Sequence, residues 1–130
     1  MIIDHQLLDS LSSLAKTSPR LRQNYDLRNS EEDNSQRMLN ALEPGTVMPI
    51  HRHRKTSETI CLVRGKMVMR LYDYKGNVAD EFVMEPCEEH PMVQVEAGQW
   101  HSLEVLEEGT VLHEAKDGKC EPTQDEDIMR

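Results

Sequence analysis

The stretch that decides the fold runs from Gly45 to Gly65 and reads GTVMPIHRHRKTSETICLVRG. Within it, His51 and His53 are two residues apart, so their side chains leave the same face of an extended segment. Glu58 follows a short polar turn and opens the next apolar run. Because imidazole nitrogens and carboxylate oxygens bind divalent ions, the stretch predicts a metal site built on two neighbouring strands.

Short apolar runs continue on both sides of this stretch and alternate with turn signals from residue 37 onward. The runs span residues 38–42, 47–50, 59–63, 67–72, 78–84, 92–95, 103–106 and 111–115. About eight short strands at even spacing are typical of an all-β sandwich or barrel. We therefore expect one small all-β domain, a barrel or jelly roll.

A barrel brings distant strands side by side, and this makes His101 a partner for the first two histidines. It lies at the start of a later strand, just after a glycine turn. A strand period of two places Glu58, Ile60 and Leu62 on the inward face. The same period turns Cys61 outward, so we do not expect it to be a ligand.

The predicted metal ligands are three histidines and one carboxylate: His51, His53, Glu58 and His101. This set suits one divalent transition metal ion (Fe, Mn, Ni, Cu or Zn), and the lack of a thiolate argues against a structural zinc site. Four protein ligands leave one or two positions open on a five- or six-coordinate ion, as catalysis requires. Glu58 has a second interpretation, in which it orients a ligand without touching the ion. No residue is assigned a catalytic role, and no organic cofactor is expected.

The first segment predicts a helix, because an apolar stripe follows Asp4, a suitable N-cap, and Ser18-Pro19 ends it. The stripe consists of Leu7, Leu8, Leu11, Leu14 and Ala15. We expect residues 1–36 to form this helix and a linker arm packed on the barrel, 37–118 the barrel, and 119–130 a C-terminal tail that is loose or draped over the surface. The linker, residues 20–36, is expected to be a surface loop or an arm with few strands.

The charge balance limits the partners. The chain has 15 basic and 24 acidic residues among 130, a formal net charge of -9. A nucleic acid or an anionic membrane surface requires clustered Lys and Arg, so neither is expected as a partner. No run reaches the roughly 18 apolar residues of a membrane span. Three scattered cysteines without a CxxC pair, together with the absence of a signal-peptide pattern, favour the cytoplasm.

Other polar side chains have simpler interpretations. The remaining histidines are expected to lie outside the site: His5, His90 and His113. Arg64 and Arg70 are expected to face solvent from their strands, although either could bind an anion. Glu114 and Lys116 share one strand face, where they either orient a ligand or form an exposed pair.

The spacing around the histidines is similar to the first motif of the cupin superfamily: Gly45-x5-His51-x-His53-x4-Glu58-x6-Gly65. Gly98-x2-His101 resembles part of the second cupin motif, whose proline and asparagine are replaced here by Glu96 and Val105. The resemblance implies a double-stranded β-helix barrel, a bound metal ion and pairing of two copies through sheet edges. It carries no particular activity, because the second motif is incomplete.

Within the superfamily, the chain resembles the WbuC-type cupin-fold metalloproteins over about residues 7–118. The segments that carry this resemblance are Ser18-Pro19-Arg20, Gln36-Arg37-Met38, Ala41-Leu42, Pro44-Gly45, Pro49-x-His51-Arg52-His53, Leu62-Val63-Arg64-Gly65 and Ala97-Gly98-x-Trp100-His101. The family is bacterial and often encoded near surface-polysaccharide genes. The resemblance also suggests that Arg20, Arg22 and Tyr25 lie near the barrel mouth.

These observations leave three hypotheses about function. The favoured one is a metal-dependent enzyme, acting on a small polar molecule such as a sugar or nucleotide-sugar in surface-polysaccharide metabolism. The second is an Fe(II)-dependent oxygenase, and the third is a non-catalytic module that binds a metal or ligand. The expected partners are a small-molecule ligand and a second copy of the chain in a homodimer.

Overall fold

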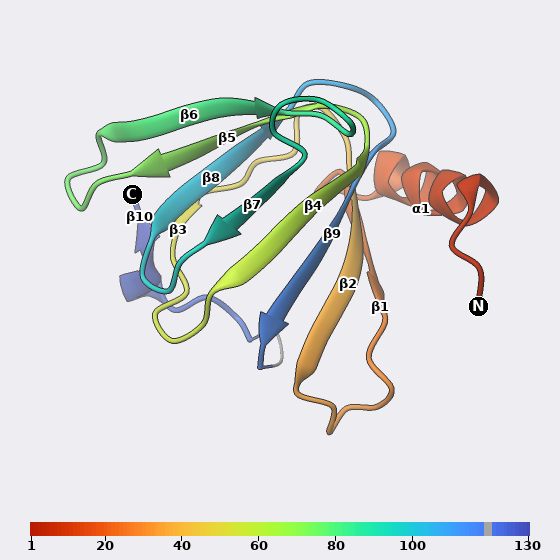
Figure 1. The fold of residues 1–130 in the computed structure, drawn as a ribbon, viewed down its shortest axis with the longest axis horizontal. Helices are drawn as coiled ribbons and strands as arrows, with labels where there is room; N and C mark the ends of the chain where they lie inside the picture. The colour runs from red at the N-terminus through yellow and green to blue at the C-terminus, as the bar shows by residue number, and fades with distance from the viewer. Residues whose placement is uncertain (119–120) are drawn as a thin grey trace.

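Two five-stranded antiparallel sheets face each other, and one helix lies outside them (Figure 1). The computed structural model describes residues 1–118 and 121–130. The first sheet has the order β1-β2-β9-β4-β7, with β1 Arg22–Asp26, β2 Ser35–Leu42, β9 Thr110–Asp117, β4 Glu58–Arg64 and β7 Met92–Val95. The second has the order β10-β3-β8-β5-β6, with β10 Ile128–Met129, β3 Ile50–His51, β8 Trp100–Val105, β5 Met67–Tyr72 and β6 Val78–Met84. This is the expected all-β jelly roll with a short N-terminal helix.

The main core fills the space between the sheets with aliphatic and methionine side chains. Its fully buried members from both sheets include Leu42, Leu112, Met67, Met69 and Met84. Inward and outward residues alternate along a strand that contributes one face to such a core. Along β4, Ile60 and Leu62 are buried while Val63 is exposed, so the predicted period is confirmed.

The helix α1, His5–Thr17, packs on the outer face of the first sheet. Asp4 caps it, because its carboxylate accepts a hydrogen bond from the Leu7 backbone N–H at 3.0 Å. A second apolar cluster joins the helix to the sheet: Leu8, Leu11, Ala15, Leu39, Ala41 and Val111. Leu14 is 53% exposed, so the stripe is narrower than predicted.

Arg64 corrects an expectation, because it does not simply face solvent. Its guanidinium bonds Asp9 Oδ1 at 2.7 Å and Ser12 Oγ at 3.0 Å, and so fastens the helix to β4. Arg70 does lie on the outer face, between Glu81 and Glu104. Neither arginine is available to the interior of the barrel.

Three predicted strands match the observed ones residue for residue: β5, β6 and β7. The predicted run 47–50 is mostly irregular, and only Ile50 of that run belongs to β3. Pro49 explains the difference, because proline has no N–H to give to a ladder.

The N-terminal arm and the tail are more ordered than the sequence suggested. The strand β1 pairs with all of the second half of β2, so the interpretation of residues 20–36 as a loop or strand-poor arm is wrong for Arg22–Asp26. The tail ends in a short 3-10 helix, Asp125–Asp127, and in β10, which pairs with β3. It is therefore not loose there. Cys120 of the predicted tail lies outside the described residues.

Gly65 shows why the motif contains glycine at this position. Its φ is +92°, and a Cβ added there would lie 2.6 Å from the Thr110 Cα. The β4–β5 turn therefore packs against the backbone of β9 too closely for any side chain.

Among the described residues, no helix is long and apolar enough to cross a membrane.

Candidate metal centre

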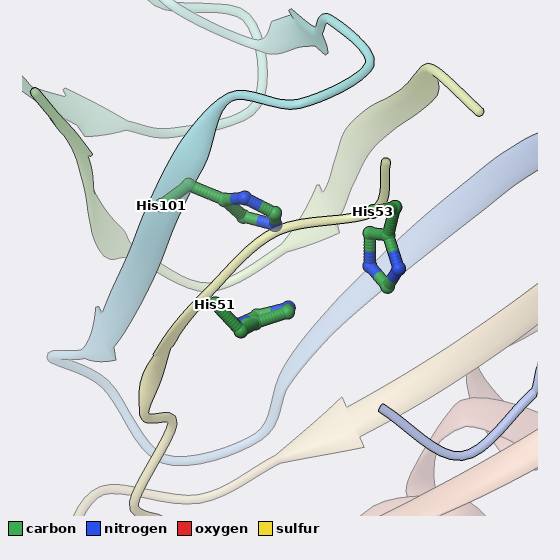
Figure 2. A group of neighbouring side chains, drawn as sticks. All are labelled: His51, His53 and His101. Atoms are coloured by element: carbon green, nitrogen blue, oxygen red, sulfur yellow. The ribbon is translucent and has the colours of Figure 1, made fainter. Parts of the chain in front are cut away.

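Three histidines converge at one end of the barrel (Figure 2). His51 lies in β3 directly opposite His101 of β8, and His53 follows β3 by two residues. The ring centroids of His51 and His101 are 4.3 Å apart, and that of His53 lies 5.2 Å from His51. One ring nitrogen from each lies within 4.8 Å of the others, so the three could hold one ion.

Glu58 reaches the same place from the opposite sheet. Its side chain enters from the start of β4 and is only 4% exposed. Its Oε1 lies 3.1 Å from His101 Nε2, and its Oε2 lies 3.8 Å from His53 Nε2. All four residues singled out by spacing are thus brought together in the structure.

Backbone carbonyls fix two of the imidazole rings. The Nδ1–H of His51 donates to the Pro49 carbonyl at 2.9 Å, and that of His101 donates to the Gln99 carbonyl at 2.9 Å. A carbonyl can only accept, so Nδ1 carries the proton in His51, whereas both ring nitrogens of His101 face an acceptor, the Gln99 carbonyl and Glu58 Oε1. Such bonds leave Nε2 to face the centre and orient it as a ligand, as is usual at metal sites.

Burial keeps the first two histidines neutral. It lowers the pKa of His51 to about 4, aided by the neighbouring His101 and opposed by the hydrogen bond to Pro49. Burial also lowers the pKa of His53, against the pull of Glu58. Both rings are therefore in the neutral form that binds metal at pH 7.

Glu58 stays ionised despite its burial. Burial is the largest influence and would raise the pKa of its carboxyl, but the hydrogen bond with His101, together with the positive charge of His101 and His53 when these rings are protonated, outweighs it and lowers the pKa to about 2. The site thus combines three imidazole rings, two of them kept neutral by burial, with one carboxylate.

The donor set fits a divalent transition metal ion. Two ligand atoms about 2.1 Å from one ion and at right angles to each other are about 3.0 Å apart. The 3.1 Å between Glu58 Oε1 and His101 Nε2 matches that spacing. Cys61, the nearest cysteine in sequence, lies on the outward face of β4, paired with His113 of β9. No described thiolate therefore joins the group.

Glu114 and Asn40 extend the site beyond the residues predicted to hold the ion. Glu114 hydrogen-bonds Glu58 and Asn40, and burial followed by the charge of Glu58 raises its pKa to about 7. The sequence left Glu114 undecided, and Asn40 was missed. The sequence of β9 does place Leu112, Glu114 and Lys116 on one face of the strand. Only the register between β4 and β9 shows that this face meets Glu58.

A cavity of about 210 Å³ opens beside these side chains. Residues of the N-terminal arm also line it, including Arg20 and Arg22. The remaining histidines stay outside the group, as expected: His5 and His90 are exposed, and His113 lies half-buried on the outer face of β9.

Comparison with known proteins adds a family and a fold. Residues 3–84 match the family described as Domain of unknown function (DUF6016). No curated protein matches the sequence.

Solved structures similar to this one share its fold at low sequence identity. KdgF from Halomonas sp. is 12% identical with a TM-score of 0.63, over 80% of this chain and 85% of that one. The capsular polysaccharide assembling protein CapF from Staphylococcus aureus is 20% identical with a TM-score of 0.61, over 78% of this chain but only 29% of that one. An oxalate oxidase in complex with the substrate analogue glycolate is 13% identical with a TM-score of 0.63, over 78% of this chain and 53% of that one.

Identities this low show a common fold alone, and the fold is that of the cupins. The family match covers well over half of the sequence and includes three of the four converging side chains, all but His101. The chain is thus a cupin-fold protein and belongs to the DUF6016 family.

Proposed function

We propose that this protein binds one divalent transition metal ion and is a metal-dependent enzyme acting on a small polar molecule. The proposed ligands are His51, His53, Glu58 and His101. The observation that carries the proposal is the convergence of these four donors, from both sheets, beside a cavity. A structural ion usually sits in a closed tetrahedron rich in cysteine, whereas this set borders a space that a substrate can enter.

The bound ion would supply a Lewis acid for a carbonyl or hydroxyl oxygen of the substrate. The chain's own residues hold the rest of the site. The carbonyls of Pro49 and Gln99 orient two imidazole rings. Glu114 hydrogen-bonds Glu58, and its pKa, raised to about 7, lets its carboxyl take up or give up a proton beside the cavity near neutral pH.

A sugar or nucleotide-sugar is the substrate class we favour, in surface-polysaccharide metabolism. The resemblance to WbuC-type proteins supports it, and so does the fold similarity to a capsular polysaccharide assembling protein. Isomerisation, epimerisation and elimination are reactions that a Lewis acid and a nearby carboxyl group can assist.

We also propose a cytoplasmic homodimer. Cys61 and Cys87 are free, which suits a reducing compartment. The edge strands β6 and β7 expose Val78, Val83 and Met92, and a second copy could cover them. Light scattering should give twice the mass of one chain, and a monomer at micromolar concentration would contradict the dimer.

Elemental analysis of protein purified without added metal tests the ion. We expect about one transition metal ion per chain, lost in His51→Ala and in His101→Ala. His113→Ala is the matched control, because it removes a histidine from the outer face of β9 and should keep the ion. A stoichiometry near zero in the wild type, unchanged by addition of metal, would end the proposal.

A substrate screen on metal-loaded protein tests the enzyme. Turnover of a sugar without oxygen, abolished in His53→Ala, would support the proposal. Oxygen consumption would instead indicate an oxygenase. Binding of no small molecule, with a sharp fall in melting temperature on metal removal, would indicate a structural ion.

A further inference from the structure

Arg22 presents a guanidinium to the cavity, and no acid among the described residues forms an ion pair with it. The Nε atom is buried and has no hydrogen-bond partner within the described part of the chain. The Nη1 atom touches only a weak acceptor, the Met48 sulfur at 3.8 Å. A buried donor without a strong acceptor is costly, so natural proteins rarely retain one without a use.

The other arginines of the chain are not left this way. Seven of the nine form ion pairs with carboxylates: Arg28, Arg37, Arg52, Arg54, Arg64, Arg70 and Arg130. The two without an ion pair among residues 1–118 and 121–130 are Arg20 and Arg22, and both line the cavity. Every other arginine side chain thus pairs with an acid, whereas Arg20 and Arg22 line the same cavity.

The charges around Arg22 are unfavourable for a cation. Burial lowers its pKa first, and the like charge of Arg20 lowers it further. Three acids also line the cavity, yet none of the three forms an ion pair with Arg22. Glu58 contacts the histidines, Glu114 hydrogen-bonds Glu58 and Asn40, and Glu121 is exposed at the rim. An anion entering the cavity would remove this imbalance.

The backbone fixes the two arginines in place. Leu21, between them, has a φ of +57°, a left-handed conformation that is strained for a leucine. It is held there by hydrogen bonds from its N–H to the Ser18 carbonyl and from the Glu43 N–H to its own carbonyl. Thr46 Oγ1 holds the Arg20 carbonyl at 2.7 Å. Three hydrogen bonds thus hold the backbone that carries the two arginines.

Asn40 adds a second unmet polar group. It is 8% exposed on β2, lines the cavity, and its amide group bonds Glu114. Its Oδ1 has no partner among the described residues. A buried carbonyl oxygen facing a cavity is complementary to a hydroxyl group of a ligand.

We propose that the cavity binds a small hydroxylated carboxylic acid, such as a sugar acid, whose carboxylate lies against Arg22 and Arg20 and whose hydroxyl donates to Asn40. A guanidinium binds a carboxylate through two parallel hydrogen bonds, which matches the donors left free. The inference rests on the proposed function and narrows its substrate class from polar molecules to acidic ones. The volume of about 210 Å³ suits a ligand of this size.

Nuclear magnetic relaxation of ligand protons tests the proposal. The protein is loaded with Mn²⁺ and titrated with D-glucuronate or with D-glucose, which has the same ring without the carboxylate. We expect glucuronate to bind at least about tenfold more tightly and to be relaxed by the ion. Arg22→Met should lower the glucuronate affinity about tenfold or more, and Arg22→Lys should restore part of it.

Two further variants test whether the effect is specific to the arginines that line the cavity. Arg70→Met removes an arginine from the outer face and should leave glucuronate affinity unchanged. Arg20→Met alters an exposed side chain that the fold does not need, and should weaken glucuronate binding severalfold without affecting glucose. Equal affinities for glucuronate and glucose, or an Arg22→Met variant that binds glucuronate as the wild type does, would overturn the proposal.

Metal content separates this inference from the function on which it rests. Wild-type protein that takes up Mn²⁺ but does not distinguish the two sugars refutes only the carboxylate subsite. Protein that takes up no Mn²⁺ refutes the metal site. In that case, glucuronate is titrated into metal-free protein, and the amide chemical shifts of Arg22 and Asn40 are monitored. This titration still tests the carboxylate subsite.

Discussion

His101 Nε2 lies 3.1 Å from Glu58 Oε1, and the two residues belong to different sheets. The pair therefore links β8 to β4 across the open end of the barrel. An ion bound between them would take over that link, so metal binding would add to the contact between the two sheets through the same two side chains.

Changing the carboxylate tests this relationship. Glu58→Gln keeps the shape but removes the negative charge, so we expect metal affinity to fall about tenfold to a hundredfold. The measurement is competition with a fluorescent chelator. Glu96→Gln is the control, because Glu96 contacts Ser57 outside the histidine group and should leave affinity unchanged. An unaltered affinity in Glu58→Gln would show that the ion does not need this carboxylate.

Metal-free protein should lose stability on mild acidification. The pKa of His51 is about 4 in the folded state and about 6.5 when exposed, so the unfolded state binds more protons between these values. Stability therefore falls as pH drops from about 6.5 towards 4, by at most about 1.4 kcal/mol per pH unit for this group. His53 shifts in the same direction and adds to the slope.

Urea unfolding between pH 4 and pH 8 measures this slope. His51→Ala should flatten it, and His5→Ala, which alters an exposed helix residue, should not. A metal-free protein whose stability is constant from pH 7 to pH 4.5 would contradict the burial of neutral imidazoles.

Arg22→Met should raise the melting temperature of the ligand-free protein. The substitution keeps an apolar stem and removes a guanidinium whose Nε is buried and for which no acid among the described residues forms an ion pair. Most substitutions at half-buried positions destabilise, so a gain of a few degrees would be distinctive. Calorimetry of both proteins, with Arg64→Met as a comparison, checks it. Arg64→Met should lower the melting temperature, because Arg64 fastens the helix through Asp9 and Ser12.

Gly65→Ala should be strongly destabilising. The added Cβ would meet the Thr110 backbone, and the φ of +92° disfavours any side chain. We expect a loss of about 3 kcal/mol or more, from strain and steric overlap together. Gly98→Ala is the matched control, since its φ is +85° but nothing lies within 4 Å of the new atom. It should cost only about 1 kcal/mol. Equal losses in both variants would contradict the close approach.

The sequence was most informative where residues that can bind a metal ion lie on segments with the two-residue period of a strand. His51 and His53 are two residues apart, so local geometry was enough to place them together. Glu58 enters from the opposite sheet and required the fold. His101 required the barrel, and the short strands with their turns predicted one. Three strands that lie next to clear turn signals, β5, β6 and β7, were predicted to the residue.

The missed features depend on pairings that no local pattern records. The strand β1 has the sequence RQNYD, which is polar enough to resemble a loop, and it is a strand because β2 lies beside it. The same pairing carries Arg22 to the cavity mouth. The role of Asn40 was hidden for a similar reason, because an isolated asparagine in a strand gives no sign of which group it faces.

The strand β3 is only two residues long, yet it carries His51 between β8 on one side and β10 on the other. Ile128 pairs with His51 itself, and Asp127 binds the side chains of Arg52 and Arg54 that flank His53. Residues more than 70 positions downstream thus hold the backbone of a proposed ligand. Thermodynamic linkage makes this reciprocal: the free energy by which the docked tail improves metal affinity equals the free energy by which a bound ion stabilises the docked tail.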